Sequence, residues 1–271
     1  MTALSQWAVQ TGAQGPELML PDHWRCVDLL SDLHLSAQSP GTVEAFLCHL
    51  RHTSADAVLL LGDVFEAWIG DDVLDDADGF EARVCDALHA VSQRVALACL
   101  HGNRDFLIGQ RFADRTGCLL LPDPILLRGW GQRVLLMHGD ALCLDDQAYQ
   151  AFRREVRQPA WQAAALSRPL IQRRALAAQM RATSQSHQRA AGGPEGYGDL
   201  DSSAMLAALE AAQANELVHG HTHRPGTQQL DGQRRRWVLS DWELEPGSTA
   251  PRGDLIRFSG DGLVRLSPAR A

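Results

Sequence analysis

The feature that most constrains this chain is a run of aliphatic residues, 58–61, that ends at Gly62 and Asp63. A run of this kind is typical of a strand buried on both faces, and the glycine after it indicates a turn. A single Gly-Asp after a strand usually marks only a turn. Four further apolar runs, however, also end at Asp, Asn or His. They are residues 26–30 before Ser31-Asp32-Leu33-His34, residues 95–100 before His101-Gly102-Asn103-Arg104-Asp105, residues 134–137 before His138-Gly139-Asp140, and residues 217–218 before His219-Gly220-His221-Thr222-His223.

Strands and helices alternate through the first part of the chain. Strands are expected at 26–30, 56–61 and 95–100, and helices at 42–51, 80–91 and 107–115. This alternation favours a parallel sheet built from βαβ units. Beyond Gly117, short strands at 118–121, 125–128 and 134–138 are joined by turns, which predicts a second, mixed sheet. Because open α/β sheets bind ligands at the carboxyl ends of their strands, we expect the five polar turns to form one site.

The two ends of the chain differ in how regular they are. Residues 1–24 show no clear period and are interpreted as a loosely held extension. Near the other end, a helix is expected at 202–214, followed by the His-bearing strand and two hairpins that turn at Asp231-Gly232 and Gly260-Asp261-Gly262. The expected organisation is an α/β core at 25–144 and 197–271, with an insertion at 145–196.

The insertion is helical in composition and basic. Residues 147–194 hold eight arginines and one acid, a charge of +7 in a chain whose net charge is −8. Ser167-Arg168-Pro169 is typical of a helix start, and apolar pairs four residues apart predict an inward-facing stripe. Charge runs most often form a solvated helical face. The alternative is a basic surface that contacts phosphates or anionic lipid.

The composition narrows the class of protein. Six scattered cysteines without a CxxC pair indicate reduced thiols in a cytosolic protein. No apolar run approaches the ~20 residues of a membrane-spanning helix, and the first residues lack the features of a secretory signal. The acidic body and the few aromatic residues do not favour nucleic-acid binding. Nothing in the sequence indicates an obligate protein partner.

The polar turns carry a set of ligands suited to divalent metal ions. Imidazole nitrogens mixed with carboxylate and amide oxygens suit Mn²⁺, Fe²⁺ or Zn²⁺, and sometimes Mg²⁺. Seven side chains are candidates, which is too many for one ion and fits two ions that share a bridging carboxylate. They are Asp32, His34, Asp63, Asn103, His138, His221 and His223. His101 and His219 lie within expected strands and are interpreted as core residues bonded to backbone.

Taken in order, these motifs resemble those of the calcineurin-like metallophosphoesterases. The resemblance implies a sandwich of two mixed β-sheets flanked by helices, with a helical cap insertion and two Mn²⁺ ions per chain. It implies that one ion is held by Asp32, His34, Asp63 and His223, and the other by Asp63, Asn103, His138 and His221. It further implies catalytic roles for Asp63, Asn103, Arg104 and His138.

Arg104 bears on the class of substrate. Most members of the family carry a histidine at this position, which protonates the leaving group. An alkoxide leaving group needs that proton, whereas a phosphate is already stable as an anion near neutral pH. Arginine instead offers a permanent charge and a fork of donors for phosphate oxygens, so a diphosphate substrate fits Arg104 better. The alternative is that Arg104 only pairs with Asp105.

Within the family, the similarity is greatest to members that hydrolyse UDP-2,3-diacylglucosamine in lipid A biosynthesis. It implies that a metal-activated hydroxide attacks the α-phosphorus and releases UMP and 2,3-diacylglucosamine 1-phosphate. The implied substrate contacts are Asn103, Arg104, Asp146, Ser184, Gln188 and His221, with Arg189 or Ala191 as the alternatives for the cap contacts. The insertion corresponds to a cap that covers the acyl chains, so a peripheral location at the anionic, cytoplasmic face of the inner membrane is expected.

Two rival functions stay open. Another phosphoesterase of the family, acting on nucleotides or phosphoproteins, would keep the metal ligands without needing an arginine-rich apolar cap. A non-catalytic scaffold with the same fold is expected to have lost ligands, and here all seven are present.

Overall fold

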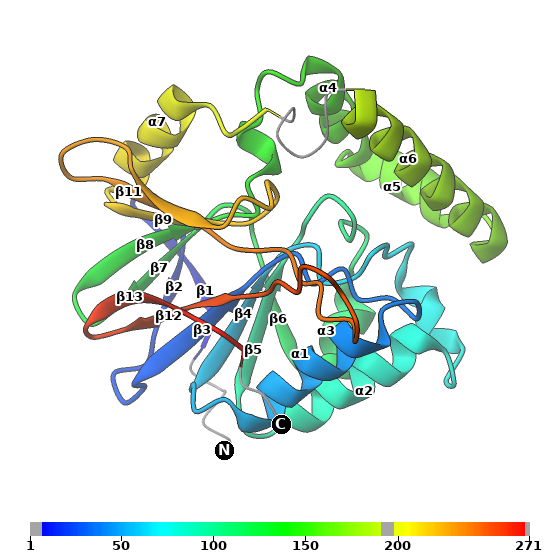
Figure 1. The fold of residues 1–271 in the computed structure, drawn as a ribbon, viewed down its shortest axis with the longest axis horizontal. Coiled ribbons are helices and arrows are strands. Elements are labelled where there is room, and N and C mark those ends of the chain that lie inside the picture. Colours follow the sequence, from blue (N-terminus) through cyan, green and yellow to red (C-terminus); the bar gives the residue numbers. More distant parts are fainter. Residues whose placement is uncertain (1–6, 191–197, 269–271) are drawn as a thin grey trace.

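Two stacked β-sheets form the body of the protein in the computed structural model, which describes residues 7–190 and 198–268, with the backbone alone for 183–190 (Figure 1). One sheet has six strands in the order β13-β12-β3-β4-β5-β6. These are β3 (Cys26–Leu30), β4 (Ala57–Leu61), β5 (Ala96–Leu100), β6 (Cys118–Leu121), β12 (Leu255–Ser259) and β13 (Gly262–Leu266). Strands β3 to β6 run parallel, and β12 is antiparallel to both of its neighbours.

The second sheet has seven strands in the order β1-β2-β7-β8-β9-β11-β10. They are β1 (Val9–Gly12), β2 (Gly15–Met19), β7 (Ile125–Gly129), β8 (Gln132–Leu136), β9 (Glu216–His219), β10 (Gly226–Gln229) and β11 (Arg235–Val238). Three of its pairs are antiparallel and three are parallel, so it is mixed. The expected fold class, an α/β sandwich of two mixed sheets, is confirmed, and so are both predicted hairpins.

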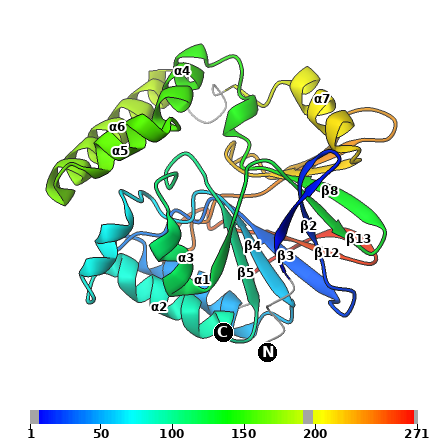
Figure 2. The same cartoon turned by 180° about the vertical axis from the view of Figure 1, so that it is seen from behind.

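Helices cover the outer faces of the sandwich. The six-stranded sheet is covered by α1 (Pro40–His52), α2 (Phe80–Ser92) and α3 (Gln110–Thr116), and the seven-stranded sheet by α7 (Ser202–Ala212) (Figure 2). Strand β4 explains why this layering forms. All five of its residues are buried, because Ala57, Leu59 and Leu61 pack between the sheets while Val58 and Leu60 pack against the helices. A strand that is covered on both faces has an unbroken run of apolar residues in its sequence.

Two of the expectations about the core are wrong. Strand β6 was expected in the second sheet, but it pairs with β5 and extends the first. Residues 7–24 are not a loose extension either: β1 and β2 form a hairpin, and β2 pairs in parallel with β7. Leu18 is fully buried, and the Trp7 and Trp24 rings meet edge to face with centroids 5.2 Å apart. Burial of these side chains compensates for the cost of ordering the segment.

Three helices, α4 (Gln147–Val156), α5 (Pro159–Leu166) and α6 (Leu170–Ala190), lie above the ends of the sheets, with α5 and α6 side by side (Figures 1 and 2). The predicted helix start is confirmed, since the Pro169 carbonyl accepts the first bonds of α6. We refer to these helices as the cap. Its predicted limits at 145 and 196 stay a prediction, and residue 196 lies outside the described residues. No helix among the described residues is long and apolar enough to cross a membrane.

Candidate active site

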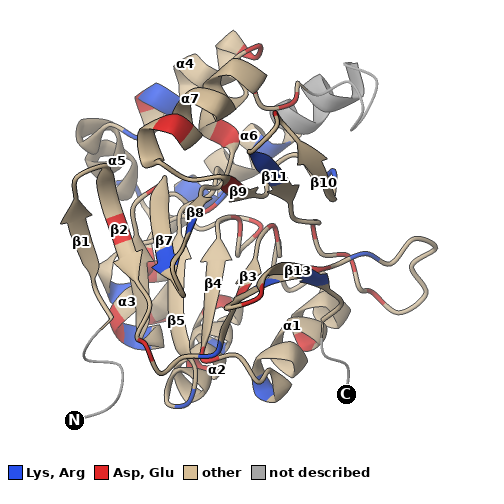
Figure 3. Ribbon diagram, turned by 90° about the vertical axis from the view of Figure 1, so that its left-hand side faces the viewer, with Lys and Arg blue, Asp and Glu red and all other residues tan. Residues whose placement is uncertain are grey.

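The polar turns predicted from the sequence meet at one edge of the sandwich, where β3, β4, β5, β8 and β9 end. Asp32 and His34 follow β3, Asp63 follows β4, and Asn103 follows β5. His138, His221 and His223 follow the strands of the second sheet. Figure 3 shows acidic segments on the loops between the upper ends of β3 and β4 and the cap. The site therefore lies between the two sheets and beneath the cap.

Most of these turns hold a strained backbone. Five of the seven candidate ligands have a positive φ: Asp32 (54°), His34 (46°), Asp63 (53°), His221 (65°) and His223 (53°). This left-handed conformation is uncommon for residues other than glycine and persists only where the surrounding structure enforces it. Such strain gathers at functional sites, so the backbone itself marks these five residues.

Glycines let the turns approach one another closely. A Cβ atom at Gly102 would overlap the Asp63 carboxylate and its backbone nitrogen. A Cβ atom at Gly220 would overlap the side chains of Asp32 and Ser31. The glycines of the GNRD and GHTH motifs are thus needed for the turns of neighbouring strands to converge.

The first group of candidate ligands consists of Asp32, His34 and His223, whose ligand atoms all lie within 4.8 Å of one another. The Nε2 atoms of the two imidazoles are 3.3 Å apart, and His223 Nε2 lies 3.3 Å from Asp32 Oδ1. Burial lowers the pKa of His34 well below its usual range, so its ring is neutral and offers a lone pair. Two imidazoles and a carboxylate aimed at one point suit a divalent cation.

The second group consists of Asp32, Asp63 and His138, also with ligand atoms within 4.8 Å of one another. Asn103 Oδ1 lies 3.0 Å from His138 Nε2 and 2.9 Å from His221 Nδ1, which brings both remaining candidates to this group. The other ring nitrogen of His138 lies 3.0 Å from the Leu61 carbonyl oxygen, which orients the ring. All seven candidate ligands are therefore together, and their assignment to two ions stays a prediction.

The electrostatics of the second group also suit a cation. Burial raises the pKa of Asp63 to about 7. Burial acts in the opposite direction on His138, but the charges of Asp63 and Asp32 outweigh it and raise the pKa of its imidazole to about 9. Both shifts favour the protonated forms, so the buried pair of Asp63 and His138 retains a proton that exposed side chains would release. A divalent cation at the same place would provide the positive charge instead.

Arg104 extends over this site from the loop after β5. Its Nη1 donates to Glu66 Oε1 over 2.6 Å, and its Nε lies 3.8 Å from Asp63 Oδ2. The alternative pairing with Asp105 is wrong. Asp105 is fully buried and accepts from the backbone nitrogens of Val64 and Gly102, both over 2.7 Å. It fastens the turn after β4 to the turn after β5.

Several acids that support the site were missed by the sequence analysis. Glu66 and Asp241 lie 3.6 Å from the Nδ1 atoms of His34 and His223, respectively, on the side away from the ligand atoms. Asp140 is buried and accepts from Tyr149 and Arg153 of α4, over 2.6 and 2.8 Å. Asp140 stands within a quoted motif and Glu66 only three residues after Asp63, but Asp241 has no such signal, because its contact forms only in the folded chain.

The predicted substrate contacts of the cap are only partly described. Asp146 is the N-cap of α4, where its side chain accepts from the Tyr149 nitrogen over 2.9 Å. The Tyr149 ring stacks on His221 with centroids 6.1 Å apart, so the start of the cap contacts the site. The side chains of Ser184, Gln188 and Arg189, and all of Ala191, lie outside the described residues.

The charge of the insertion is directed largely at the core, which neither sequence interpretation anticipated. Five of its seven arginines with described side chains contact acids or carbonyls outside the cap. They are Arg153 on Asp140, Arg157 on the Gly102 carbonyl, Arg173 on Asp72, Arg174 on Glu81 and Arg181 on Glu66. Arg173 is buried and also donates to the Ile69 carbonyl over 2.5 Å. These pairs fasten the cap over the site, and the basic segment is not simply a solvated face.

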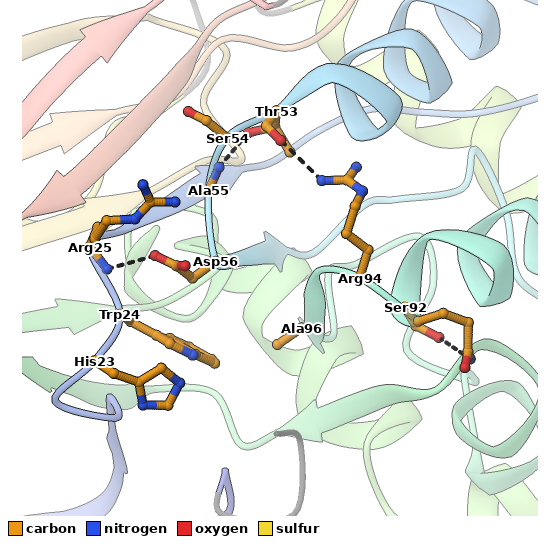
Figure 4. Close-up of a pocket in the computed structure, with 11 residues that line it drawn as sticks. His23, Trp24, Arg25, Thr53, Ser54, Ala55, Asp56, Ser92, Arg94 and Ala96 are labelled. Atoms are coloured by element: carbon orange, nitrogen blue, oxygen red, sulfur yellow. Dashed lines mark hydrogen bonds between the residues drawn. The ribbon is translucent and has the colours of Figure 1, made fainter. Parts of the chain in front are cut away.

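The two histidines interpreted as core residues both contact backbone carbonyls as expected, but only His219 is buried. His101 Nε2 lies 2.8 Å from the Ile108 carbonyl, and His219 Nδ1 lies 2.9 Å from the Gly220 carbonyl. The cysteines are free thiols, and all but Cys26 are buried. A cavity of about 410 Å³ lies at the opposite, amino end of β3, β4 and β5 (Figure 4). Arg94 in its lining donates to the last carbonyls of α1, which is a capping role.

Comparison with known proteins agrees with this geometry. A model of the calcineurin-like phosphoesterase family matches residues 27–225. The chain belongs to this family. The match spans all of the candidate ligands and the cap of this calcineurin-like phosphoesterase.

Relatives extend the similarity over most of the chain. The UDP-2,3-diacylglucosamine hydrolase of Bordetella pertussis is 46% identical over 240 residues, which cover 87% of this chain and 92% of that protein. Its counterparts from Serratia proteamaculans and Escherichia coli O81 (strain ED1a) are 41% and 42% identical, each covering 86% of this chain and 95% of the relative. An archaeal phosphodiesterase of known structure aligns at 10% identity over 89% of this chain and 98% of that chain, with a TM-score of 0.45, a likeness too distant to carry an argument.

Proposed function

We propose that this calcineurin-like phosphoesterase hydrolyses the diphosphate of UDP-2,3-diacylglucosamine, releasing UMP and 2,3-diacylglucosamine 1-phosphate for lipid A biosynthesis. The observation that carries the proposal is the 46% identity to a hydrolase named for this substrate, over 87% of the chain. The family match, over residues 27–225, includes both the ligand turns and the cap. The gathering of seven ligands at one sheet edge supports it independently.

The residues present fit two divalent cations, which we propose to be Mn²⁺. The neutral imidazole of His34, the facing nitrogens of His34 and His223, and the buried acids Asp32 and Asp63 form a donor set of mixed nitrogen and oxygen. Asp32, His34, Asp63 and His223 would hold one ion, and Asp63, Asn103, His138 and His221 the other. When bound, such a pair supplies positive charge for the phosphate oxygens and lowers the pKa of water.

The chain itself supplies orientation and charge for the diphosphate. Arg104 is held at the site between Asp63 and Glu66, with 19% of its side chain exposed, so its guanidinium is available to a phosphate oxygen. Since the α-phosphorus is attacked and the departing sugar phosphate is already an anion, the reaction needs no general acid at this position. Arg104 would instead stabilise the charge that accumulates on the phosphates.

The cap would recognise the lipid part of the substrate. Its apolar side chains include Trp161, which packs on Phe106 of the loop after β5 with ring centroids 6.0 Å apart. We propose that the cap takes up the acyl chains, that Asp146, Ser184 and Gln188 contact the head group, and that the protein is peripheral to the cytoplasmic face of the inner membrane. Flotation with anionic vesicles tests the membrane step. Equal flotation with and without residues 147–194 would overturn it.

The test of the reaction is metal-dependent release of UMP from UDP-2,3-diacylglucosamine, beside p-nitrophenyl phosphate as a generic ester. We expect UMP release with Mn²⁺, no release by Asp63→Ala, and a loss of at least about 100-fold by Arg104→Ala. If only the generic ester is cleaved, the lipid substrate is wrong and another phosphoesterase activity takes its place. If neither is cleaved while metal binds, the scaffold alternative is favoured.

A further inference from the structure

Glu66 contacts three parts of the protein, and the proposed reaction gives it no role. Its side chain is 16% exposed and stands three residues after Asp63, where its backbone nitrogen donates to the Leu35 carbonyl over 3.1 Å. The carboxylate contacts three groups from three different parts of the protein. They are His34 from the turn after β3, Arg104 from the loop after β5, and Arg181 from α6 of the cap.

The contact with His34 is on the side of the ring that faces away from the ligand group. Nδ1 of His34 is buried and has no hydrogen-bond partner among the described side chains and backbone. Glu66 Oε2 lies 3.6 Å from it, slightly beyond hydrogen-bond length. A carboxylate that accepts from the outer nitrogen of a ligating histidine fixes its tautomer and raises its basicity. Glu66 is placed to do this for His34.

The other oxygen of Glu66 is shared by two guanidinium groups. Arg104 Nη1 lies 2.6 Å and Arg181 Nε 2.9 Å from the same atom, Oε1. Arg104 is the residue proposed to bind phosphate, whereas Arg181 belongs to the cap and is 49% exposed. One carboxylate therefore sets the position of Arg104 and is itself held by the cap.

We propose that Glu66 is a positioning residue that couples closure of the cap to the metal ligand His34 and to the phosphate-binding Arg104. With Arg181 on Glu66, the carboxylate faces His34 and keeps Arg104 over Asp63. Without that contact, the carboxylate can turn away, and both groups lose their orientation. This inference rests on the proposed function, because it assigns Arg104 to the substrate.

A second ion pair between the cap and the core provides a control, because it tests whether Glu66 only helps to hold the cap in place. Arg174 lies on the same side of α6 as Arg181 and pairs with Glu81 of α2 over 3.9 Å. Glu81→Gln thus removes a second ion pair between cap and core without touching a candidate ligand. Glu66→Gln keeps the size of the side chain and removes its charge. Glu66→Asp restores the charge on a shorter side chain.

The experiment measures two quantities for each variant of the full chain: Mn²⁺ affinity by calorimetric titration of chelator-treated protein, and KM and kcat for UMP release at saturating Mn²⁺. We expect Glu66→Gln to weaken one of the two Mn²⁺ sites, the one that includes His34, at least about tenfold and to raise KM severalfold, with partial recovery in Glu66→Asp. Glu81→Gln should stay within about twofold of wild type in both. Circular dichroism checks that each variant is folded.

A second arm tests the coupling to the cap. Arg181→Ala should raise KM, and combining it with Glu66→Gln should raise KM no further, because both changes break the same contact. The inference is overturned if Glu66→Gln behaves like Glu81→Gln, or if the two KM effects multiply. Failure of the proposed function gives a different result: wild type would then release no UMP, while the Mn²⁺ titrations would still compare Glu66→Gln with Glu81→Gln.

Discussion

At the scale of single residues, the site depends on a glycine that has no Cβ atom. Gly102 separates the turn after β5 from Asp63, and a methyl group there would overlap the Asp63 carboxylate and backbone. We predict that Gly102→Ala displaces Asp63 and lowers UMP release at least about 100-fold, because such displacements are costly in catalysis. It should also destabilise the fold by about 1–3 kcal/mol, as expected for overpacking. Release of UMP by the purified variant and its urea unfolding measure both effects.

Gly232 provides the control for this substitution. It lies in the β10–β11 hairpin, and a Cβ atom there would meet no neighbour within 4 Å. Gly232→Ala should therefore leave both UMP release and unfolding close to wild type. If Gly102→Ala is as active as Gly232→Ala, the close approach of the two turns is not needed for function.

How much of the site the sequence predicts also differs residue by residue. All seven candidate ligands were identified from motifs, because each follows a run that forms a buried strand and parallel strands end at a common edge. Asp241 was not identified, since it lies 3.6 Å from His223 only after the chain between β11 and β12 has folded back. The pairing of Arg104 with Glu66 rather than Asp105 was also missed. Arg104 and Asp105 are adjacent in sequence, but their side chains point in different directions in the folded chain.

At the scale of elements, the cap is fastened to the core by an ion pair whose arginine is buried. Arg173 of α6 has 4% of its side chain exposed and pairs with Asp72 through both guanidinium nitrogens. Removing the carboxylate leaves a buried charge with only carbonyl partners, which is strongly unfavourable. We predict that Asp72→Ala increases hydrogen exchange of the α6 amides at least about tenfold, a local opening that leaves the sheet amides unchanged.

Asp75 is the comparison for the cap experiment. It pairs with Arg111 of α3 at the surface, and both side chains are more than half exposed. Asp72 and Asp75 both lie in the short 3-10 helix Asp71–Asp75. Asp75→Ala therefore removes an acid from the same element without touching the cap, and exchange in α6 should match wild type. Equal exchange in Asp72→Ala and wild type would mean that other contacts hold the cap in place.

The N-terminal hairpin is the element that the sequence analysis missed. Its strands are short and show no clear alternation, and β2 pairs with β7, more than a hundred residues away, which no local pattern reveals. Leu18 on β2 is fully buried between the sheets. We predict that Leu18→Ala costs about 2–4 kcal/mol in urea unfolding. Gln10→Ala on the exposed side of β1 should cost less than about 0.5 kcal/mol, and equal costs would contradict integration of the hairpin into the sheet.

At the scale of the whole molecule, Asp28 joins three elements far from the site. On β3, it pairs with Arg257 of β12 over 2.7 Å, accepts from Thr53 over 2.5 Å at the end of α1, and lies 3.3 Å from His49 within that helix. Burial opposes ionisation of Asp28, but hydrogen bonds from His49, Arg257 and Thr53 outweigh it and lower its pKa to about 2. The folded state therefore binds this proton less readily than the unfolded state, whose carboxyl has a pKa of about 3.9.

The sign of the pH dependence follows from that difference. The stabilisation by Asp28 is fully present above about pH 5 and is lost as the pH falls from about 4 to about 2, where both states become protonated. It amounts to about 2–3 kcal/mol in total, of which about 1 kcal/mol is lost by pH 3. Asp28→Asn should be less stable than wild type at pH 6, and the gap in unfolding free energy should narrow by about 1 kcal/mol at pH 3. Urea unfolding at the two pH values measures this, and a gap of constant size would show that Asp28 does not titrate differently in the folded protein.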